Sequence, residues 1–174
     1  MPETVSRQIS NTEFVFAVRS ILTGARCRSA WLGYGEMLYV GFELPGGSRD
    51  NSPRRPSRLR ELSTFWADWV VSDADQKEFR RDDSREALIG PVDCLIGRSV
   101  ESLNIDPDSW TIELRLSGHI SLSVIPDLLE QDADEPEDSD TWVVQEGEFY
   151  YSVSRRRVLT VDTYIYNPGD ATTP

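Results

Sequence analysis

Apolar residues near the start of the chain recur first at a helical spacing and then at a strand spacing. From Asn11, which can cap a helix, they return every three or four positions until Gly24, and this predicts a helix of about three turns. Residues 26–32 are then predicted to be extended, and alternating apolar and polar side chains over residues 38–44 predict a second strand. The turn between them is predicted at Gly33-Tyr34-Gly35, so the pattern indicates a helix followed by a hairpin with one apolar face.

The same order of signals returns in the second half of the chain. Ser84 starts a second capped segment that ends at Gly97. Within it, Gly90-Pro91 predicts a kink or a restart of the helix, because proline removes a backbone donor. Residues 98–105 and 112–116 are predicted to be strands that flank a turn. Helix, glycine, strand, turn and strand therefore follow one another in the same order in both halves.

The two halves align at a nearly constant offset. The shift that places Gly24 on Gly97 also aligns the two helices, and a shift longer by one position aligns the second strands of the two hairpins. Short apolar patterns match easily by chance, but a whole series of elements in one order does so less easily. We therefore interpret residues 11–71 and 84–125 as pseudo-repeated units of one helix plus three strands.

The predicted units are too small to fold alone. One helix leaves part of a three-stranded face uncovered, whereas two units that share a core remove this exposed surface. Further strands are predicted at 64–71, 120–125, 142–144, 149–153 and 158–165. The sequence thus predicts an α+β fold with mostly antiparallel sheet, two helices and about eight or nine strands, in a single compact domain over residues 1–174.

The charge balance excludes several classes of protein. The chain of 174 residues has 30 Asp and Glu against 18 Lys and Arg, and its formal net charge is −12. Such a surface repels polyanions, so generic binding to nucleic acid is excluded. The longest apolar stretches fall far short of the roughly 20 residues that span a bilayer, and residues 1–10 lack the apolar core of a signal peptide. We therefore expect no membrane association and a cytoplasmic location.

Two segments carry most of the local charge imbalance. Residues 46–60 contain five arginines and a single acid, whereas residues 127–140 contain eight carboxylates and no base. Loops of this length are usually functional or flexible. The acidic segment lacks the tight bend of a calcium loop, so it is expected to be a solvated loop or a surface that binds a partner. The basic segment is expected to pair with acidic surface or to move freely.

Side chains that carry catalytic or metal chemistry are scarce in this sequence. His119 is the only histidine and lies at a predicted turn. Gly33-Tyr34-Gly35 lacks the third glycine of a dinucleotide loop, and the Asp106-Pro107-Asp108 turn favours solvated carboxylates. Cys27 and Cys94 follow no metal or redox spacing and are expected to be inert buried thiols. We therefore predict a protein that is not an enzyme, with no catalytic residues, no cofactor and no metal site.

Exposed aromatic residues beside acids are typical of protein-binding surfaces. Tyr34 is expected to be exposed at its turn. Trp66 and Trp69 cannot share a strand face, so one is expected in the core and the other at the surface or under a loop. The predicted partner-binding residues are two aromatic residues and five acids of the acidic segment: Tyr34, Trp69, Asp132, Asp134, Glu135, Glu137 and Asp138.

Three segments, Ala30–Leu38, Trp66–Trp69 and Leu95–Val100, resemble a family of small uncharacterised bacterial proteins. Some members are similar to the immunity-type proteins that accompany secreted polymorphic toxins. The shared motifs are turns and tryptophans rather than a chemical signature, so no catalytic residue is carried over. The resemblance implies a compact α+β domain with an accessory role.

Charge, chemistry and resemblance together favour one function over another. The leading hypothesis is a non-enzymatic protein-binding module, an immunity-type inhibitor that masks a basic effector and meets it by electrostatic steering. The alternative is a small-molecule-binding or hydrolytic domain with a pocket between the two halves. An oligomeric structural protein is a third reading, and the sequence does not fix the oligomeric state.

Overall fold

Two antiparallel β-sheets and two α-helices make up the part of the chain that the computed structural model describes, residues 3–44, 60–129 and 139–165. The helices are α1 (Asn11–Leu22) and α2 (Arg85–Asp93). In spatial order, the seven-stranded sheet contains β1 (Glu3–Gln8), β12 (Leu159–Ile165), β11 (Phe149–Ser154), β10 (Asp140–Glu146), β4 (Arg60–Thr64), β3 (Leu38–Glu43) and β2 (Arg26–Leu32). The five-stranded sheet contains β6 (Glu78–Arg80), β5 (Ala67–Ser72), β9 (Ile120–Pro126), β8 (Ile112–Leu116) and β7 (Val100–Ile105). The fold is therefore α+β and mostly sheet, as predicted.

Each helix begins after a serine that caps its first turn. The backbone of α1 donates to Ser10 Oγ over 3.2 Å, so the cap is Ser10 and the predicted cap Asn11 is already the first helical residue. Ser84 caps α2, as the sequence predicts. Pro91 lies inside α2, so the helix continues through the proline and does not restart there. Local sequence signals thus place both helix starts to within one residue.

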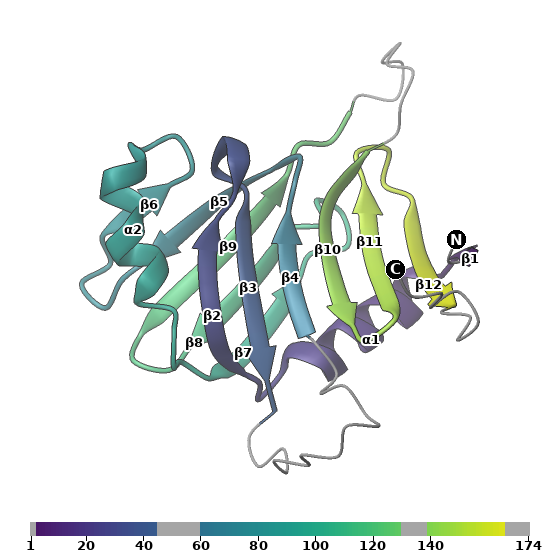
Figure 1. The fold of residues 1–174 in the computed structure, drawn as a ribbon, viewed down its shortest axis with the longest axis horizontal. Helices are drawn as coiled ribbons and strands as arrows, with labels where there is room; N and C mark the ends of the chain where they lie inside the picture. Colours follow the sequence, from purple (N-terminus) through teal and green to yellow (C-terminus); the bar gives the residue numbers. More distant parts are fainter. Residues whose placement is uncertain (1–2, 45–59, 130–138, 166–174) are drawn as a thin grey trace, which may run out of the picture.

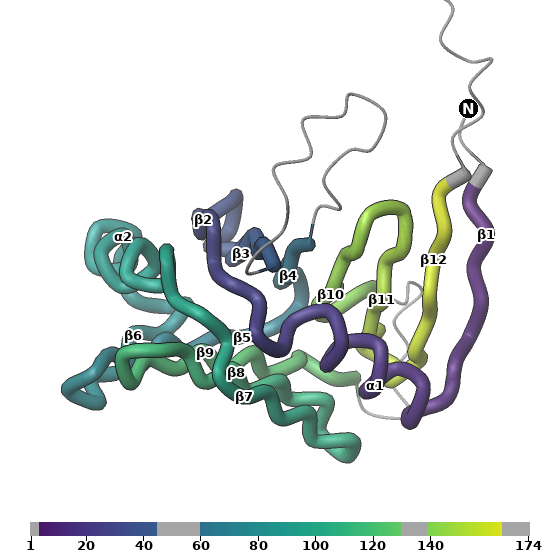
Figure 2. Tube along the Cα trace, turned by 90° about the horizontal axis from the view of Figure 1, so that it is seen from below, coloured from purple at the N-terminus to yellow at the C-terminus, as the bar shows by residue number. Residues whose placement is uncertain are grey.

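The two sheets and α1 form two layers. Figure 1 shows the five-stranded sheet behind β2, β3 and β4, and α1 behind β10, β11 and β12, so both cover the same face of the seven-stranded sheet. Figure 2 shows this arrangement after a quarter turn, with α2 beside the β2 edge. We call the covered face of the seven-stranded sheet its inner face and the opposite one its outer face. None of the described helices or strands covers the outer face of β4, β10 and β11 (Figures 1 and 2).

Three aromatic side chains join α1 to both sheets at the centre of the core. The ring of Phe14 lies 5.7 Å from the ring of Trp110 and 5.5 Å from that of Trp142, between ring centroids. Trp142, in β10, is completely buried, and its indole N–H donates to the backbone C=O of Trp110 over 2.9 Å. Since Trp110 lies just before β8, this cluster fixes α1 and the two sheets against one another.

The two sheets also meet directly, where the start of β2 lies against the start of β7. The Gly24 N–H donates to the Val100 C=O over 2.9 Å, and the Gly97 N–H donates to the Cys27 C=O over 2.8 Å. The offset that aligns the two halves places Gly24 on Gly97 and Cys27 on Val100. Each of the two bonds is therefore the equivalent of the other in the opposite half. Both glycines have positive φ, 75° and 83°. Each therefore occupies a backbone conformation that side chains with a Cβ rarely adopt.

We expect Gly24→Ala and Gly97→Ala each to lower the free energy of unfolding by about 1–2 kcal/mol, because a Cβ strains the left-handed backbone. No atom lies within 4 Å of the position that a Cβ on Gly24 would take, so its loss reflects backbone strain alone. Urea unfolding measures the change. Gly24→Asn serves as the control, since asparagine tolerates this conformation better. Equal losses for alanine and asparagine at Gly24 would contradict this explanation.

The structure contains 12 strands among the described residues, rather than eight or nine. The sequence pattern predicts neither β1 nor β6, because neither short segment has an apolar alternation. The predicted strand 64–71 is in fact divided between the two sheets: β4 ends at Thr64, β5 begins at Ala67, and the chain crosses between the layers at Phe65 and Trp66. β4 itself starts at Arg60, inside the segment predicted to be a basic loop.

Candidate functional site

Tyr34 is the most exposed large hydrophobic side chain of the described residues, with 93% of its surface accessible. It lies in the connection between β2 and β3, in a single 3₁₀ turn over Tyr34–Glu36. Gly35 and Glu36 both have positive φ, 64° and 58°. We call Gly33–Glu36 the Tyr34 turn. The predicted turn and the predicted exposure of Tyr34 are both confirmed.

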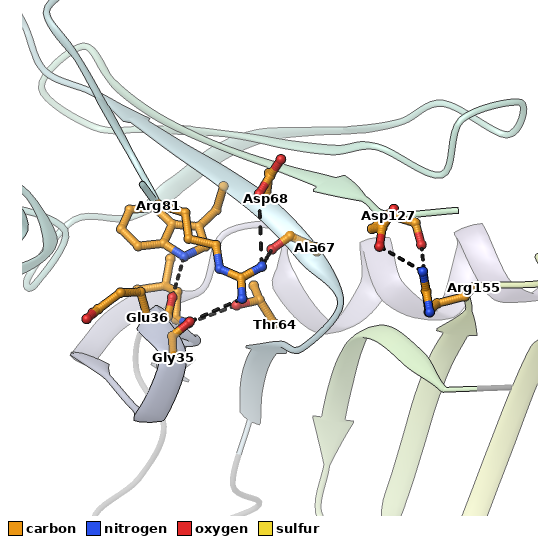
Figure 3. Close-up of polar contacts among 10 residues, drawn as sticks. Gly35, Glu36, Thr64, Ala67, Asp68, Arg81, Asp127 and Arg155 are labelled. Atoms are coloured by element: carbon orange, nitrogen blue, oxygen red, sulfur yellow. Dashed lines mark hydrogen bonds and ion pairs between the residues drawn. The ribbon is translucent and has the colours of Figure 1, made fainter. Parts of the chain in front are cut away.

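Three side chains from other parts of the chain hold the Tyr34 turn in place, and Figure 3 shows one of these contacts, between Arg81 and Gly35. The Trp69 indole N–H donates to the Glu36 C=O over 2.8 Å, and Arg81 donates to the Gly35 C=O over 3.1 Å. Arg85, the first residue of α2, donates to the Glu36 carboxylate over 3.0 Å. Because these bonds fix the backbone, the turn presents the Tyr34 ring from a preorganised support, which limits the ordering cost of binding.

Trp69 itself is not a surface residue, so the prediction that it contacts a partner is wrong for this structure. Its side chain is completely buried, with Ala67 and Val71 on the same inward face of β5. Trp66 is the exposed tryptophan of the pair, at 51% accessible surface. The Arg155 guanidinium lies over the Trp66 ring, 4.7 Å from its centroid. As predicted, one of the two tryptophans is buried and the other is exposed. The exposed one is Trp66, not the predicted Trp69.

The five acidic partner-binding candidates, Asp132, Asp134, Glu135, Glu137 and Asp138, lie outside the described residues. The structure does describe both ends of the acidic segment. Asp127 accepts a charge-assisted hydrogen bond from Arg155 over 2.9 Å (Figure 3). In the basic segment, Arg60 forms an ion pair with Glu146 in β10. Some of the charge that looks unbalanced along the sequence is therefore paired in space.

The outer face of the seven-stranded sheet carries polar and aromatic side chains in rows that cross the strands. The strand register places Tyr39 opposite Ser63, Ser63 opposite Val143 and Val143 opposite Ser152. A second row, two residues along each strand, is built from the side chains Glu61, Gln145, Tyr150 and Asp162. Directly opposite side chains in such rows lie about 4.5–5.5 Å apart at Cβ, so each row forms a continuous surface.

A pocket of about 320 Å³ opens on this outer face. Five strands, from β3 and β4 to β10, β11 and β12, contribute to its lining together with the β4–β5 crossing. Four aromatic rings take part: Tyr39, Phe65, Tyr150 and Tyr164. Three carboxylates take part: Glu61, Asp140 and Asp162. None of the described residues that line it is basic. We call it the sheet pocket.

The rings of the sheet pocket pack in two pairs. Tyr150 and Tyr164 lie edge to face with 4.7 Å between ring centroids, and Tyr39 and Phe65 do so at 6.4 Å. Trp31, 43% exposed, stacks on Tyr39 with 5.3 Å between centroids and 6° between planes. The aromatic surface therefore continues from the pocket to the end of β2, where the Tyr34 turn begins.

The electrostatics of the sheet pocket favour positive charge. The Gln145 side-chain N–H donates to the Tyr150 hydroxyl over 2.8 Å. Burial raises the pKa of Tyr150, and the neighbouring Tyr164 and Glu61 raise it further, because a second negative charge is unfavourable there. Oδ1 of Asp162 is buried and has no hydrogen-bond partner in the described structure. A buried carboxylate oxygen without a donor is costly, so this position is suited to a donor supplied by a ligand.

Residues of potential catalytic or metal chemistry are dispersed in the described ranges. His119 lies in the β8–β9 turn with a φ of 60°. Burial raises the pKa of the Cys27 thiol to about 11, which fits the predicted inert thiol, whereas Cys94 is only partly buried. No group of three or more potential metal ligands occurs within residues 3–44, 60–129 and 139–165. Neither helix of these ranges is long and apolar enough to cross a membrane.

Sequence reasoning missed the sheet pocket because its residues come from strands far apart in the chain. The alternation of β10 and β11 identifies their inward side chains, and the outward ones carry no local signal of a shared pocket. The sequence contains one clue. Tyr150 and Tyr164 lie in predicted strands, at alternating positions whose side chains point away from the core. Comparison with protein-family models, with curated proteins and with solved structures found no match. The resemblance to immunity-type proteins therefore stays a prediction.

Proposed function

We propose that this chain is a non-enzymatic protein-binding module that captures a basic partner on the outer face of its seven-stranded sheet. The sheet pocket is the observation that carries this proposal. It combines four aromatic rings with three carboxylates, and none of its described lining residues is basic. The few residues that supply most of the binding energy in protein interfaces are enriched in tryptophan, tyrosine and arginine, and complementary charge supplies specificity and speed of association.

The Tyr34 turn offers a second contact beside this surface. Its backbone is fixed by Trp69, Arg81 and Arg85, and its ring is free of the protein core. The Gly33 backbone packs against the Tyr39 ring, which also lines the sheet pocket, so the turn and the pocket are neighbours. A partner seated on the outer face of the sheet is thus within reach of Tyr34.

The net charge of −12 supports a basic partner and an inhibitor of the immunity type. An acidic protein meets a basic effector faster than random diffusion allows, because their fields attract over several ångströms. The attraction is screened at high ionic strength. Binding by this surface is therefore expected to weaken as salt increases.

The experiment uses two triple variants with equal change in charge. Glu61→Gln/Asp140→Asn/Asp162→Asn neutralises the sheet pocket, and Glu101→Gln/Asp108→Asn/Glu113→Gln neutralises three exposed acids of β7, β8 and the turn between them as the control. Each is tested for binding to the proteins encoded beside its own gene, at low and at high salt. The pocket variant is expected to bind a basic partner about tenfold more weakly or worse, and the control to bind within about twofold.

Two results would contradict the proposed function. The first is equal binding by both triple variants, which would place the partner elsewhere. The second is the absence of any basic partner among the neighbouring proteins at low salt. For the inhibitor role, co-expression of the wild-type chain must rescue cells from the partner, and the pocket variant must rescue them less.

Small-molecule binding is a second candidate, favoured by the volume of the sheet pocket. At about 320 Å³ it reaches the lower end of the range of ligand pockets, which is about 300–1,000 Å³. It lies on one sheet, whereas the sequence-based alternative places a pocket between the two halves. A thermal-shift screen with metals, nucleotides and sugars separates the candidates. A ligand that raises the melting temperature of the wild type and not of the pocket variant would favour this function.

We also infer that the two units of one helix plus three strands arose by duplication. Along the chain, each helix is followed by three strands that pair in chain order within one sheet. These strands are β2-β3-β4 after α1 and β7-β8-β9 after α2. Irregularities of register fall at Cys27/Ser29 and at Val100/Ser102, which are equivalent positions under the offset that places Gly24 on Gly97. The equivalent hydrogen bonds of these two glycines support the same relation.

A further inference from the structure

We propose that the Asp162 end of the sheet pocket is a socket for one arginine side chain of the partner. The inference rests on the proposed function, since it names the chemical group by which the partner is recognised. Asp162 lies in the middle of β12, and it faces outward between two tyrosines. Tyr150 lies directly opposite on β11, and Tyr164 is the next outward residue of β12.

The carboxylate of Asp162 has an oxygen to which none of the described residues donates a hydrogen bond. Its Oδ1 is buried and has no hydrogen-bond partner among the described residues. On β1, the residue opposite Asp162 is Ser6, and on β11 it is Tyr150, so neither neighbouring strand offers a cation there. A ligand that brings its own N–H groups and a positive charge would satisfy this oxygen.

The two tyrosine rings supply the walls of the socket. They lie 4.7 Å apart at an angle of 69°, so one presents its edge to the other, and both rings line the pocket. Tyr164 is 42% exposed, which leaves its ring accessible. Cations are attracted to the face of an aromatic ring, and a planar guanidinium can stack on it while it pairs with a carboxylate.

Arginine fits these features better than lysine. Its guanidinium carries five N–H donors in a plane, so it can donate to the Asp162 carboxylate and still lie flat against Tyr150 or Tyr164. A lysine ammonium is a compact, strongly hydrated charge that must lose more water to enter a half-buried site. The Tyr150 hydroxyl accepts from Gln145, which holds this ring in position for the ligand.

The test uses N-acetyl-arginine methylamide as the probe, in a titration followed through the NMR signals of the tyrosine rings. We expect saturable shifts at Tyr150 and Tyr164 with a dissociation constant in the millimolar range, as one side chain alone gives weak binding. The citrulline analogue has the same shape without the charge, and it should bind about tenfold more weakly or not at all. The lysine analogue should bind more weakly than the arginine probe.

Asp162→Asn is the diagnostic variant, because it keeps the shape of the side chain and removes the charge. It should weaken binding of the arginine probe by about tenfold or more without lowering the melting temperature. Asp108→Asn, an exposed change of the same kind in the β7–β8 turn, should leave binding unchanged.

Each outcome is decisive for the socket. Absence of shifts with the arginine probe, equal binding of citrulline, or unchanged binding by Asp162→Asn would overturn it. Equal binding of lysine would overturn the assignment to a guanidinium. None of these results touches the proposed function, which fails only if the pocket triple variant and its control bind the partner equally or if no basic partner is found.

Discussion

Trp142→Ala is expected to lower the free energy of unfolding by about 3–5 kcal/mol, the largest loss that we predict for any single change in this protein. Trp142 is completely buried in β10, and its ring packs against Phe14 of α1. Removing it opens a cavity where α1 meets both sheets. It also leaves the C=O of Trp110 without the indole N–H that now reaches it over 2.9 Å.

Urea unfolding followed by far-UV circular dichroism measures this loss without relying on tryptophan fluorescence. Trp142→Phe separates the two contributions, since phenylalanine fills part of the space and cannot donate; it should lose about 1–3 kcal/mol. Tyr34→Ala is the matched control, because its ring is 93% exposed, and its stability should stay within about 0.5 kcal/mol of the wild type. A Trp142→Ala variant as stable as Tyr34→Ala would contradict the packing described here.

Elements with a complete local signal were predicted well. The helix over Asn11–Leu22 combines a helical period, an acid in the first turn and a stop at Gly24, and the structure places α1 at these residues. The hairpin of β2 and β3 has alternation on one strand and glycines at its turn, and it too lies where predicted. In both cases the residues that determine the structure are close together in the chain.

Elements whose partners are distant were missed or misplaced. β1 is polar along most of its length and becomes a strand through its antiparallel pairing with β12, which lies near the other end of the chain. The chain crosses between sheets at Phe65 and Trp66, inside what looks like one strand. Backbone bonds from Phe65 to Thr141 and from Asp127 to Trp66 fix this crossing, and no local pattern reveals them.

The candidate site illustrates the same division. Exposure of Tyr34 follows from two flanking glycines and was predictable. The reversal of Trp66 and Trp69 was also within reach, because Ala67, Trp69 and Val71 form the apolar side of an alternating strand around the exposed Asp68. The sheet pocket was not, since it depends on the spatial order β3-β4-β10-β11-β12, which follows from the pairing of β4 with the distant strand β10.

Arg60→Leu is expected to lower the free energy of unfolding by about 2–4 kcal/mol, although most exchanges of a charged residue have little effect. Arg60 begins β4 and forms an ion pair with Glu146 in β10, with only 11% and 19% of the two side chains exposed. Its guanidinium also donates to the C=O of Ile21 in the last turn of α1, over 2.6 Å. Leucine leaves both the carboxylate and this helix-end carbonyl without their donor.

Arg80→Leu provides a control of the same chemistry at the surface. Arg80 also pairs with a glutamate, Glu78, but 57% and 52% of these side chains are exposed, so water screens the pair and replaces it at little cost. We expect its loss to remain within about 0.5 kcal/mol. Equal losses for Arg60→Leu and Arg80→Leu would show that burial does not strengthen the inner pair.

The double variant Arg60→Leu/Glu146→Leu distinguishes an unpaired charge from lost packing. If the loss in Arg60→Leu arises from the Glu146 carboxylate left without its partner, replacing Glu146 as well should restore part of the stability. The double variant has no unpaired buried charge, and its two leucine side chains can pack against each other in the same space. If the loss arises from the Ile21 carbonyl and the Arg60 stem, the double variant should be no more stable than the single one. Urea unfolding of the wild type, Arg60→Leu, Glu146→Leu and the double variant gives the coupling between the two sites directly. A double variant that loses less stability than the sum of the two single losses would show that the charge of Arg60 joins β4 to β10.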